Sequence, residues 1–175
     1  GLVGFGGIGT EVAKRAVPFG MKVIYFCRHP NPADDAAYGV QSVSMEELLK
    51  ESDYVVAAVP LTDQTFHLFN EECIAQMKAG SVLINIARGP VVDEEALAQS
   101  LASGHLGGCA VDVFPKEPCT DSVLTRYSNA LLTPHSATST AENSKATNFA
   151  AANNLVNYLK KDIDAKYVVV QGTRY

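Results

Sequence analysis

The sequence predicts an α/β fold, namely a Rossmann-type, doubly wound parallel sheet with helices on both faces. Two observations support this prediction. Segments that read as buried strands alternate with helical segments along the chain, and this order requires a parallel sheet with crossover helices. The first strand also runs directly into a glycine-rich turn and a helical pattern. Ligands bind such sheets at the carboxyl ends of the strands, so we expect the chemically active residues there.

A glycine-rich turn follows the first predicted strand. Gly4, Gly6 and Gly9 have the spacing G-x-G-x-x-G, with Gly7 and Ile8 before the last glycine. The first glycine permits a tight turn, the second lets a pyrophosphate approach the backbone, and the third allows close helix packing. A glycine-rich turn without a ligand would fit the spacing alone. The flanking strand and helix, and a second strand after them, favour dinucleotide binding.

The remaining elements follow in the βαβ order. Ser44 and Glu47 form a capping box that opens a short helix, and apolar runs on both sides of a strand are typical of buried parallel sheets. The predicted strands cover residues 22–27, 40–43, 53–60, 81–87, 106–113 and 130–133. The other predicted segments are a Pro-rich loop at 29–32, helices over 70–78, 93–103 and 140–160, and a short helix from Asp121, with Gly80 and Gly104 as C-caps.

The composition indicates one globular domain. The chain has 175 residues, 47% of them hydrophobic, which is enough for a substantial core. Its net charge is −5 with acids and bases interspersed, and a nucleic-acid surface would need a basic stripe. No apolar run approaches the roughly 20 residues of a membrane helix, and no signal peptide is visible. The four cysteines form no C-x-x-C pair, so we predict reduced thiols, a cytoplasmic location and no metal site.

Three chemically active residues follow successive predicted strands. Arg88 ends one strand, Glu117 lies just beyond the next, and His135 follows the last. Individually they could be a surface arginine, a solvated loop acid and a structural histidine. Together they would supply an anion clamp, a carboxylate that orients an imidazole, and a proton donor. This set suits protonation of a carbonyl oxygen as a hydride arrives.

The end of the second predicted strand bears on the choice of nucleotide. An acid there would bind ribose hydroxyls, but Cys27 and Arg28 occupy this place. An arginine can bind a 2′-phosphate, which an acid would repel; the alternative is a solvated Arg28. Asp112 ends its own strand and either accepts a hydrogen bond from a nicotinamide carboxamide or caps nearby backbone N–H groups. No role is predicted for the remaining histidines, which are His29, His67 and His105.

These motifs together resemble the nucleotide-binding domain of the D-isomer-specific 2-hydroxyacid dehydrogenases. They cover nearly the whole chain in the family's order: the glycine turn, Asn85–Gly89, Val92–Leu97, Gly107–Pro118 and Thr133–His135. The resemblance implies that Arg88 binds the substrate carboxylate and carbonyl, that His135 is the general acid/base, and that Glu117 orients it. It also implies a nicotinamide contact from Asp112. Related formate dehydrogenases carry an amide where Glu117 stands, so Glu117 counts against formate as substrate.

Within this family, residues 25–32 and 151–155 are similar to those of glyoxylate/hydroxypyruvate reductases, which use NADPH. Arg28 and both prolines match, whereas Asn31 stands where the resemblance implies a second basic residue. We therefore predict NADP(H) as the preferred cofactor, with NAD(H) possible. The predicted cofactor-binding residues are Gly4, Gly6, Gly7, Ile8, Gly9, Cys27, Arg28, Val59, Pro60, Thr65, Ala87, Arg88, Asp112, His135 and Ala137.

The resulting prediction is an NAD(P)-dependent 2-hydroxyacid dehydrogenase that reduces a small 2-keto acid such as glyoxylate or hydroxypyruvate. The alternative is a non-catalytic, NAD(H)-sensing module on the same scaffold, like the corepressors built on it. The resemblance implies a dinucleotide-binding domain over 1–160 and a tail over 161–175 that leads back to a preceding substrate domain. We therefore expect a fragment that is inactive on its own, and a homodimer formed through this domain.

Overall fold

The computed structural model describes residues 1–162 and residue 164 of the chain. The chain divides into two compact units, Gly1–Pro134 and His135–Tyr175. Most of the predicted tail at 161–175 lies outside the described residues.

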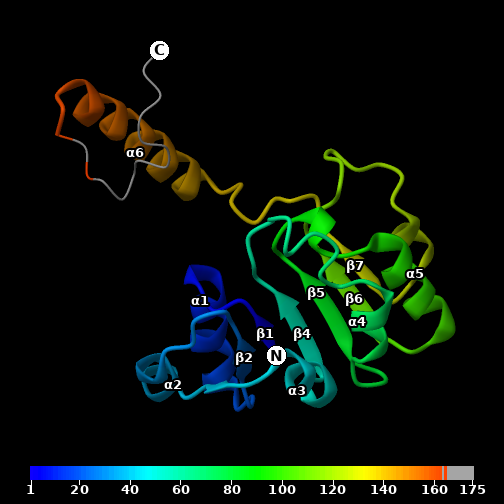
Figure 1. Cartoon of the computed structure of the whole chain (residues 1–175). Coiled ribbons are helices and arrows are strands. Elements are labelled where there is room, and N and C mark those ends of the chain that lie inside the picture. Colours follow the sequence, from blue (N-terminus) through cyan, green and yellow to red (C-terminus); the bar gives the residue numbers. More distant parts are fainter. Residues whose placement is uncertain (163, 165–175) are drawn as a thin grey trace. The chain divides into compact units, whose positions relative to one another are not determined.

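The first unit is built on one seven-stranded sheet in which every neighbouring pair is parallel (Figure 1). Its strands are β1 (Leu2–Val3), β2 (Ile24–Phe26), β3 (Gln41–Ser42), β4 (Tyr54–Ala57), β5 (Val82–Asn85), β6 (Gly108–Val111) and β7 (Ala130–Leu132). They lie in the order β3-β2-β1-β4-β5-β6-β7. The order of the strands therefore reverses between β1 and β4, and such a switch point is where ligands bind in open α/β sheets. This confirms the predicted fold class.

The connections between the strands are helical. The α-helices are α1 (Gly7–Ala16), α2 (Pro32–Tyr38), α3 (Met45–Glu51), α4 (Glu71–Ala75) and α5 (Glu94–Ser103), and the 3₁₀ turns are η1 (Val17–Phe19), η2 (Gly89–Val91) and η3 (Val123–Arg126). As predicted, the hydroxyl of Ser44 accepts a hydrogen bond from the N–H of Glu47 at the start of α3 (3.1 Å). Gly104 ends α5 in the left-handed region at φ 74°.

The core has two layers because neighbouring strand residues point to opposite faces of the sheet. Val3, Ile24 and Val55 belong to one buried cluster together with side chains of α3, α4 and α5. Leu2 and Tyr25, their neighbours along the strands, belong to a second cluster with Ala13 of α1. Helices thus cover both faces of the sheet, and the carboxyl edge between the two layers stays open.

Two predicted segments differ from the observed ones. The Pro-rich loop leads into a helix that was not predicted, α2, because Asn31 caps it and Pro32 occupies its first position. The helix predicted over 70–78 ends earlier, at Ala75. The N–H of Met77 there bonds to Ile74 at 3.1 Å, a tighter spacing than that of an α-helix, and the Met77 side chain is buried in the core.

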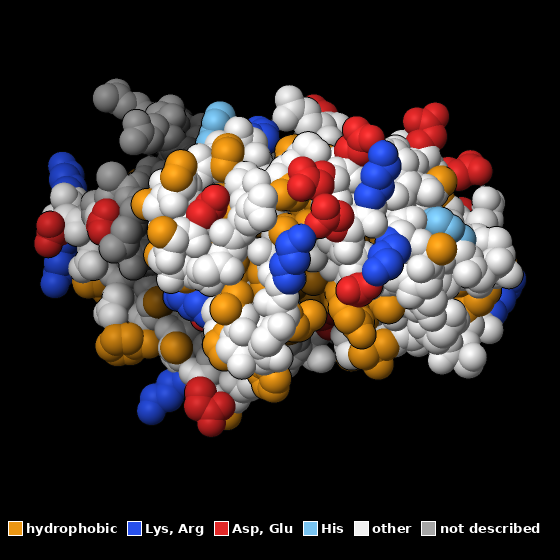
Figure 2. Space-filling model, turned by 90° about the horizontal axis from the view of Figure 1, so that it is seen from below, with side chains coloured by type: hydrophobic (Ala, Val, Ile, Leu, Met, Phe, Trp, Pro, Cys, Tyr) orange, Lys and Arg blue, Asp and Glu red, His pale blue; other side chains and the backbone are white. Residues whose placement is uncertain are grey.

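The described part of the second unit forms a long helix, α6 (Ala141–Leu159), close to the predicted bounds. Thr140 is its N-cap, and the Thr140 hydroxyl accepts a hydrogen bond from the N–H of Asn143 at 3.1 Å. Among the described residues, none of the helices is long and apolar enough to cross a membrane. Figure 2 shows acidic and basic side chains interspersed with apolar ones on one face of the molecule.

Candidate nucleotide-binding and active site

The glycine turn between β1 and α1 lies at the switch point of the sheet. A Cβ on Gly4 would lie 2.4 Å from the carbonyl oxygen of Ala58, and one on Gly9 would lie 2.3 Å from the carbonyl oxygen of Gly4. Both contacts are with backbone atoms, which cannot rotate away, and Gly4 also has a φ of 102°. A Cβ on Gly6 or Gly7 would meet nothing within 4 Å. Two glycines therefore close the turn, and two face open space.

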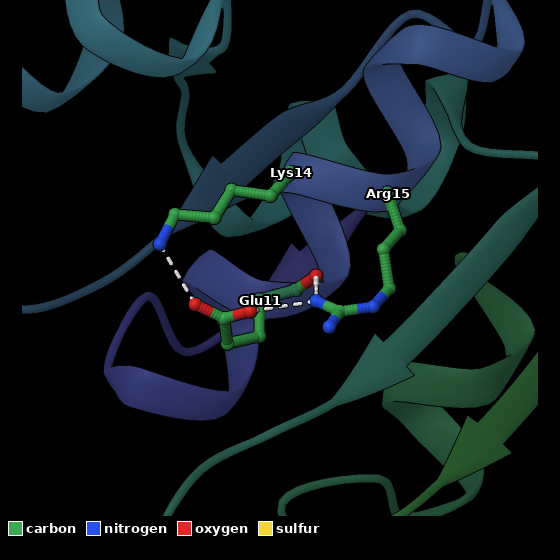
Figure 3. Close-up of polar contacts among 3 residues, drawn as sticks. All are labelled: Glu11, Lys14 and Arg15. Atoms are coloured by element: carbon green, nitrogen blue, oxygen red, sulfur yellow. Dashed lines mark hydrogen bonds and ion pairs between the residues drawn. The ribbon is translucent and has the colours of Figure 1, made fainter.

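Helix α1 suits an anion at its N-terminus. It begins at Gly7, its N-cap Gly6 has no side chain to occupy the first N–H groups, and its first turn contains no acid. The first carboxylate, Glu11, is paired with Lys14 (2.7 Å) and Arg15 (2.6 Å), as Figure 3 shows. The hydrogen bond from Arg15, and then that from Lys14, lower the pKa of Glu11 to about 2. Its charge is thus balanced within α1.

Two adjoining cavities flank the glycine turn. The β2-side cavity, about 510 Å³, lies between the turn, the end of β2 and the loop after β4. The β5-side cavity, about 490 Å³, lies between the turn, the same loop and the end of β5. Gly6, Val59 and Pro60 line both. Together they form a groove across the switch point, which fits the extended shape of a dinucleotide.

Most of the predicted cofactor residues line this groove. Gly4, Cys27, Arg28 and Thr65 line the β2-side cavity, whereas Gly7, Ile8, Ala87 and Arg88 line the β5-side cavity. Gly9 packs against Gly4 and lines neither cavity. Sequence reasoning missed His29, Thr62 and Gln64 in the β2-side cavity, because exposed polar loop residues carry no periodic signal.

The loop after β4 is shaped by Thr65. Its hydroxyl donates to the carbonyl oxygen of Pro60 (2.6 Å) and accepts from the N–H of Thr62 (2.8 Å). The loop is also tied to η2, because the N–H of His67 donates to the carbonyl oxygen of Pro90 at 2.8 Å. Thr65 therefore holds the wall of the cavity in shape as well as lining it.

Arg88 is positioned by a buried asparagine that sequence reasoning did not single out. Asn85 is 1% exposed, its side-chain oxygen accepts from the N–H of Ala87 (3.1 Å), and its amide donates to the carbonyl oxygen of Arg88 (3.1 Å). These two bonds fix the turn that follows β5. The guanidinium of Arg88 is exposed and donates to the carbonyl oxygen of Ala87 at 2.7 Å. Arg88 thus stands at the edge of the β5-side cavity.

The segments that carry Arg88 and Glu117 are in direct backbone contact. A Cβ on Gly89 would lie 2.0 Å from the carbonyl carbon of Phe114 and 2.3 Å from the nitrogen of Pro115. The Glu117 carboxylate accepts a hydrogen bond from the N–H of Phe114 (3.0 Å). The first unit therefore brings two of the three predicted catalytic residues onto adjoining loops.

The other predicted residues are placed differently. The Asp112 carboxylate accepts a hydrogen bond from the hydroxyl of Thr133 (2.6 Å), and Asp112 lines neither cavity. His135 and Ala137 belong to the second unit, and His135 has a positive φ of 53°. The roles of Asp112, His135 and Ala137 stay predictions. Among the described residues, no group of His, Cys, Asp or Glu side chains could hold a metal ion.

The strand order, the glycine turn and the groove define a dinucleotide-binding Rossmann domain. The comparison with known families narrows this class. Residues 1–137 match the model of the D-isomer-specific 2-hydroxyacid dehydrogenase NAD-binding domain. Because this match covers more than half of the chain, the chain belongs to the D-isomer-specific 2-hydroxyacid dehydrogenase family.

Individual relatives agree with this assignment. The chain is 40% identical over 168 residues to a glyoxylate reductase of Thermococcus litoralis, covering 96% of this chain and 51% of that protein. It is 46% identical over 146 residues to a hydroxypyruvate reductase of Thermotoga maritima, covering 81% of this chain and 46% of that protein. A D-lactate dehydrogenase of Aquifex aeolicus, solved with NAD and lactic acid, has a TM-score of 0.84 at 32% identity, covering 92% of this chain and 53% of that one. The chain spans about half the length of these relatives.

Proposed function

We propose that this chain is the nucleotide-binding part of an NAD(P)-dependent 2-keto acid reductase, with glyoxylate or hydroxypyruvate as substrate. The observation that carries the proposal is the position of Arg88, at the edge of a cavity that adjoins the glycine turn. A cation at this point can hold a substrate carboxylate beside the nucleotide. Relatives named glyoxylate reductase and hydroxypyruvate reductase support the substrate class.

The proposed mechanism assigns one task to each residue. The groove around Gly4, Gly6 and Gly7 would hold the nicotinamide nucleotide, which would supply the hydride for the keto carbon. Arg88 binds the substrate carboxylate and polarises the carbonyl, and His135 delivers a proton to the carbonyl oxygen, so that the product is a 2-hydroxy acid. Glu117 would orient the imidazole of His135 and stabilise its protonated form. The adjoining loops of Arg88 and Glu117 support this assignment.

Further proposals concern the whole protein. A second, substrate-binding domain would complete the site, which fits the length of the relatives. We propose that the nucleotide-binding domain ends at residue 160 and that the tail over 161–175 leads to the substrate-binding domain. We also propose that the protein is a homodimer formed through the nucleotide-binding domain. A reducing cytoplasmic compartment is supported by the four cysteines, since Cys27, Cys73, Cys109 and Cys119 are all free thiols.

The catalytic proposal is tested by His135→Ala in the two-domain protein. Loss of the general acid should lower kcat for reduction of glyoxylate by about 10²–10⁴-fold. Arg126→Ala, which removes an arginine from η3 outside both cavities, serves as the control and should leave kcat unchanged. An unchanged kcat would refute the role of His135. Nucleotide binding by the wild type without any turnover would instead favour the NAD(H)-sensing module.

The preference for NADP(H) is tested by Arg28→Ala. Arg28 lines the β2-side cavity, where no acid takes the place of the ribose-binding carboxylate. A charged hydrogen bond to phosphate is worth about 1.5–3 kcal/mol, so NADPH affinity should fall by roughly 10- to 100-fold while NADH affinity is retained. Arg126→Ala removes an arginine from η3, outside both cavities, and should change neither affinity. Equal losses for both nucleotides would mean that Arg28 does not bind the phosphate.

A further inference from the structure

The β2-side cavity is lined by basic side chains and by no acidic ones. The titratable side chains that line it are Cys27, Arg28 and His29, and neither an aspartate nor a glutamate is among its lining residues. Arg28 is charged at every physiological pH. His29 adds a second positive charge only when its imidazole is protonated. A protonated His29 would thus place a second positive charge beside Arg28, with no acid among the lining residues.

The acids nearest along the chain do not line this cavity. Asp35 of α2 is engaged elsewhere, since its carboxylate accepts hydrogen bonds from the hydroxyl of Tyr25 (2.7 Å) and the N–H of Ser42 (3.5 Å). Asp34 lies in the first turn of α2, and Asp63 lies in the loop after β4. Neither is among the lining residues. A phosphate in the cavity would thus face Arg28 and His29 without an adjoining carboxylate.

Asn31 does not substitute for a second basic residue. Its side-chain oxygen accepts a hydrogen bond from the N–H of Ala33 (3.1 Å) and caps α2. His29 precedes it, is exposed, and lines the cavity beside Arg28. An imidazolium can donate an N–H to a phosphate oxygen and form a charge-assisted hydrogen bond.

Building on the proposed use of NADP(H), we propose that His29 is a second ligand for the 2′-phosphate of NADPH and acts in its protonated form. The preference for NADPH over NADH then depends on pH. Because the proposed contact needs a positive charge, and histidine is the side-chain type that gains its charge near neutral pH, NADPH binding should strengthen as the pH falls from about 8 to about 6. The phosphate itself takes up a proton near pH 6, which weakens its attraction to any cation. A variant without His29 keeps only this weakening by phosphate protonation, so it serves as the baseline for the wild type.

The test is the ratio of NADPH to NADH affinity, measured by calorimetry at about pH 6 and about pH 8 for the wild type and His29→Gln. When the pH is lowered from about 8 to about 6, the ratio of NADPH to NADH affinity should rise about 3- to 10-fold more in the wild type than in His29→Gln. This size is expected for a charged hydrogen bond in a solvated pocket. NADH affinity should be the same in both. His29→Lys keeps the positive charge at both pH values, so it should raise NADPH affinity at about pH 8.

His105→Gln is the matched control. His105 follows α5, lies outside the β2-side cavity, and its ring bonds to the carbonyl oxygen of Ile74 in α4 (3.1 Å). This variant should show the wild-type ratio at both pH values. Equal ratios in the wild type and His29→Gln at both pH values would overturn the role of His29. If the wild type bound neither nucleotide, the proposed nucleotide site itself would be wrong, so the two failures can be told apart.

Discussion

Gly89 shows how one residue can set the spacing of an active site. Its Cα lies against the backbone of Phe114 and Pro115, so that the loop of Arg88 touches the loop of Glu117. The Arg-Gly pair could be predicted from the sequence as a motif. The contact could not, because Gly89 and Phe114 are distant in sequence and only the parallel pairing of β5 with β6 brings their loops together.

Gly89→Ala should therefore separate Arg88 from Glu117. A Cβ 2.0 Å from a backbone carbon forces a shift of the chain, and such overpacking costs about 1–3 kcal/mol of stability. In the two-domain protein we expect kcat to fall by at least about 10-fold, because misplacement by about 1 Å is costly in an active site. Steady-state kinetics and urea denaturation measure the two effects.

Gly104→Ala is the control for Gly89→Ala, because it should lower stability without moving Arg88 or Glu117. Gly104 has a φ of 74° with nothing within 4 Å of its would-be Cβ, and it lies at the end of α5. Alanine there should cost about 1–2 kcal/mol because of the left-handed backbone, with kcat unchanged. If Gly89→Ala also left kcat unchanged, the contact with Phe114 would not position the site.

At the scale of elements, the loop after β4 and the start of α5 form one connected unit. Asp93 caps α5 by accepting hydrogen bonds from the N–H groups of Glu95 (3.1 Å) and Ala96 (3.2 Å). Its other carboxylate oxygen lies 3.6 Å from Nδ1 of His67, and its own N–H donates to the carbonyl oxygen of Phe69 at 3.0 Å. The loop that lines the nucleotide groove is thus anchored to the helix that follows Arg88.

Asp93→Ala should destabilise this unit by about 0.5–2 kcal/mol, the usual value of an N-cap. Asp93→Asn keeps an oxygen for the cap and loses only the charge opposite His67, so its cost should be smaller. Urea denaturation at neutral pH measures the free energy of unfolding of all three proteins. It should be highest for the wild type, lower for Asp93→Asn and lowest for Asp93→Ala. A loss of stability in Asp93→Asn as large as that in Asp93→Ala would show that the charge opposite His67, and not the cap, carries the effect.

The elements also show where prediction from sequence works. The buried strands were recognisable because an apolar run is required on both faces of a parallel sheet. Their predicted ends were one to several residues too long, because apolar residues continue into loops that pack on the core, as at Ala87 and Val113. Helix α2 was missed because Asn31 and Pro32 look like a loop until the cap bond to Ala33 is seen.

For the whole molecule, the carboxyl edge of the sheet and most of its lining residues were predictable, whereas the contacts of Asn85 and the place of His29 were not. Strand composition and the glycine spacing together predict where the nucleotide lies. The role of Asn85 depends on a buried turn, and the place of His29 depends on how the end of β2 faces the loop after β4. Such contacts join segments of separate crossovers, so local sequence patterns do not contain them.

Burial also makes the stability of the whole molecule sensitive to alkaline pH. Burial raises the pKa of Tyr25 to about 12, with a further contribution from its hydrogen bond to Asp35. Burial likewise raises the pKa values of the Cys73 and Cys109 thiols to about 11. In the unfolded chain these groups lose their protons near pH 10 for tyrosine and near pH 8.5 for cysteine. Each group is neutral and protonated in the native protein at neutral pH.

The sign of the pH effect follows from these shifts. Between about pH 9 and pH 12 the native state holds protons that the unfolded chain has released, so the free energy of unfolding falls as the pH rises. Below about pH 8 these three groups are protonated in both states, so they do not change the free energy of unfolding. One pKa unit corresponds to about 1.4 kcal/mol, so three groups whose pKa values rise by roughly two units each give at most about 8 kcal/mol across this range. We expect a smaller loss, because solvent screens the partly exposed Cys73 thiol. Urea denaturation at a series of pH values, with a reducing agent present, measures it.

Tyr25→Phe is the variant that assigns part of this loss to one residue. It removes the phenol and its bond to Asp35, so it should lower stability at neutral pH by about 1 kcal/mol and make the fall above about pH 10 less steep. The fall between about pH 9 and pH 10, which the two thiols cause, should persist. A wild-type stability that stays flat up to pH 11, or an unchanged slope in Tyr25→Phe, would show that these buried groups do not link folding to pH.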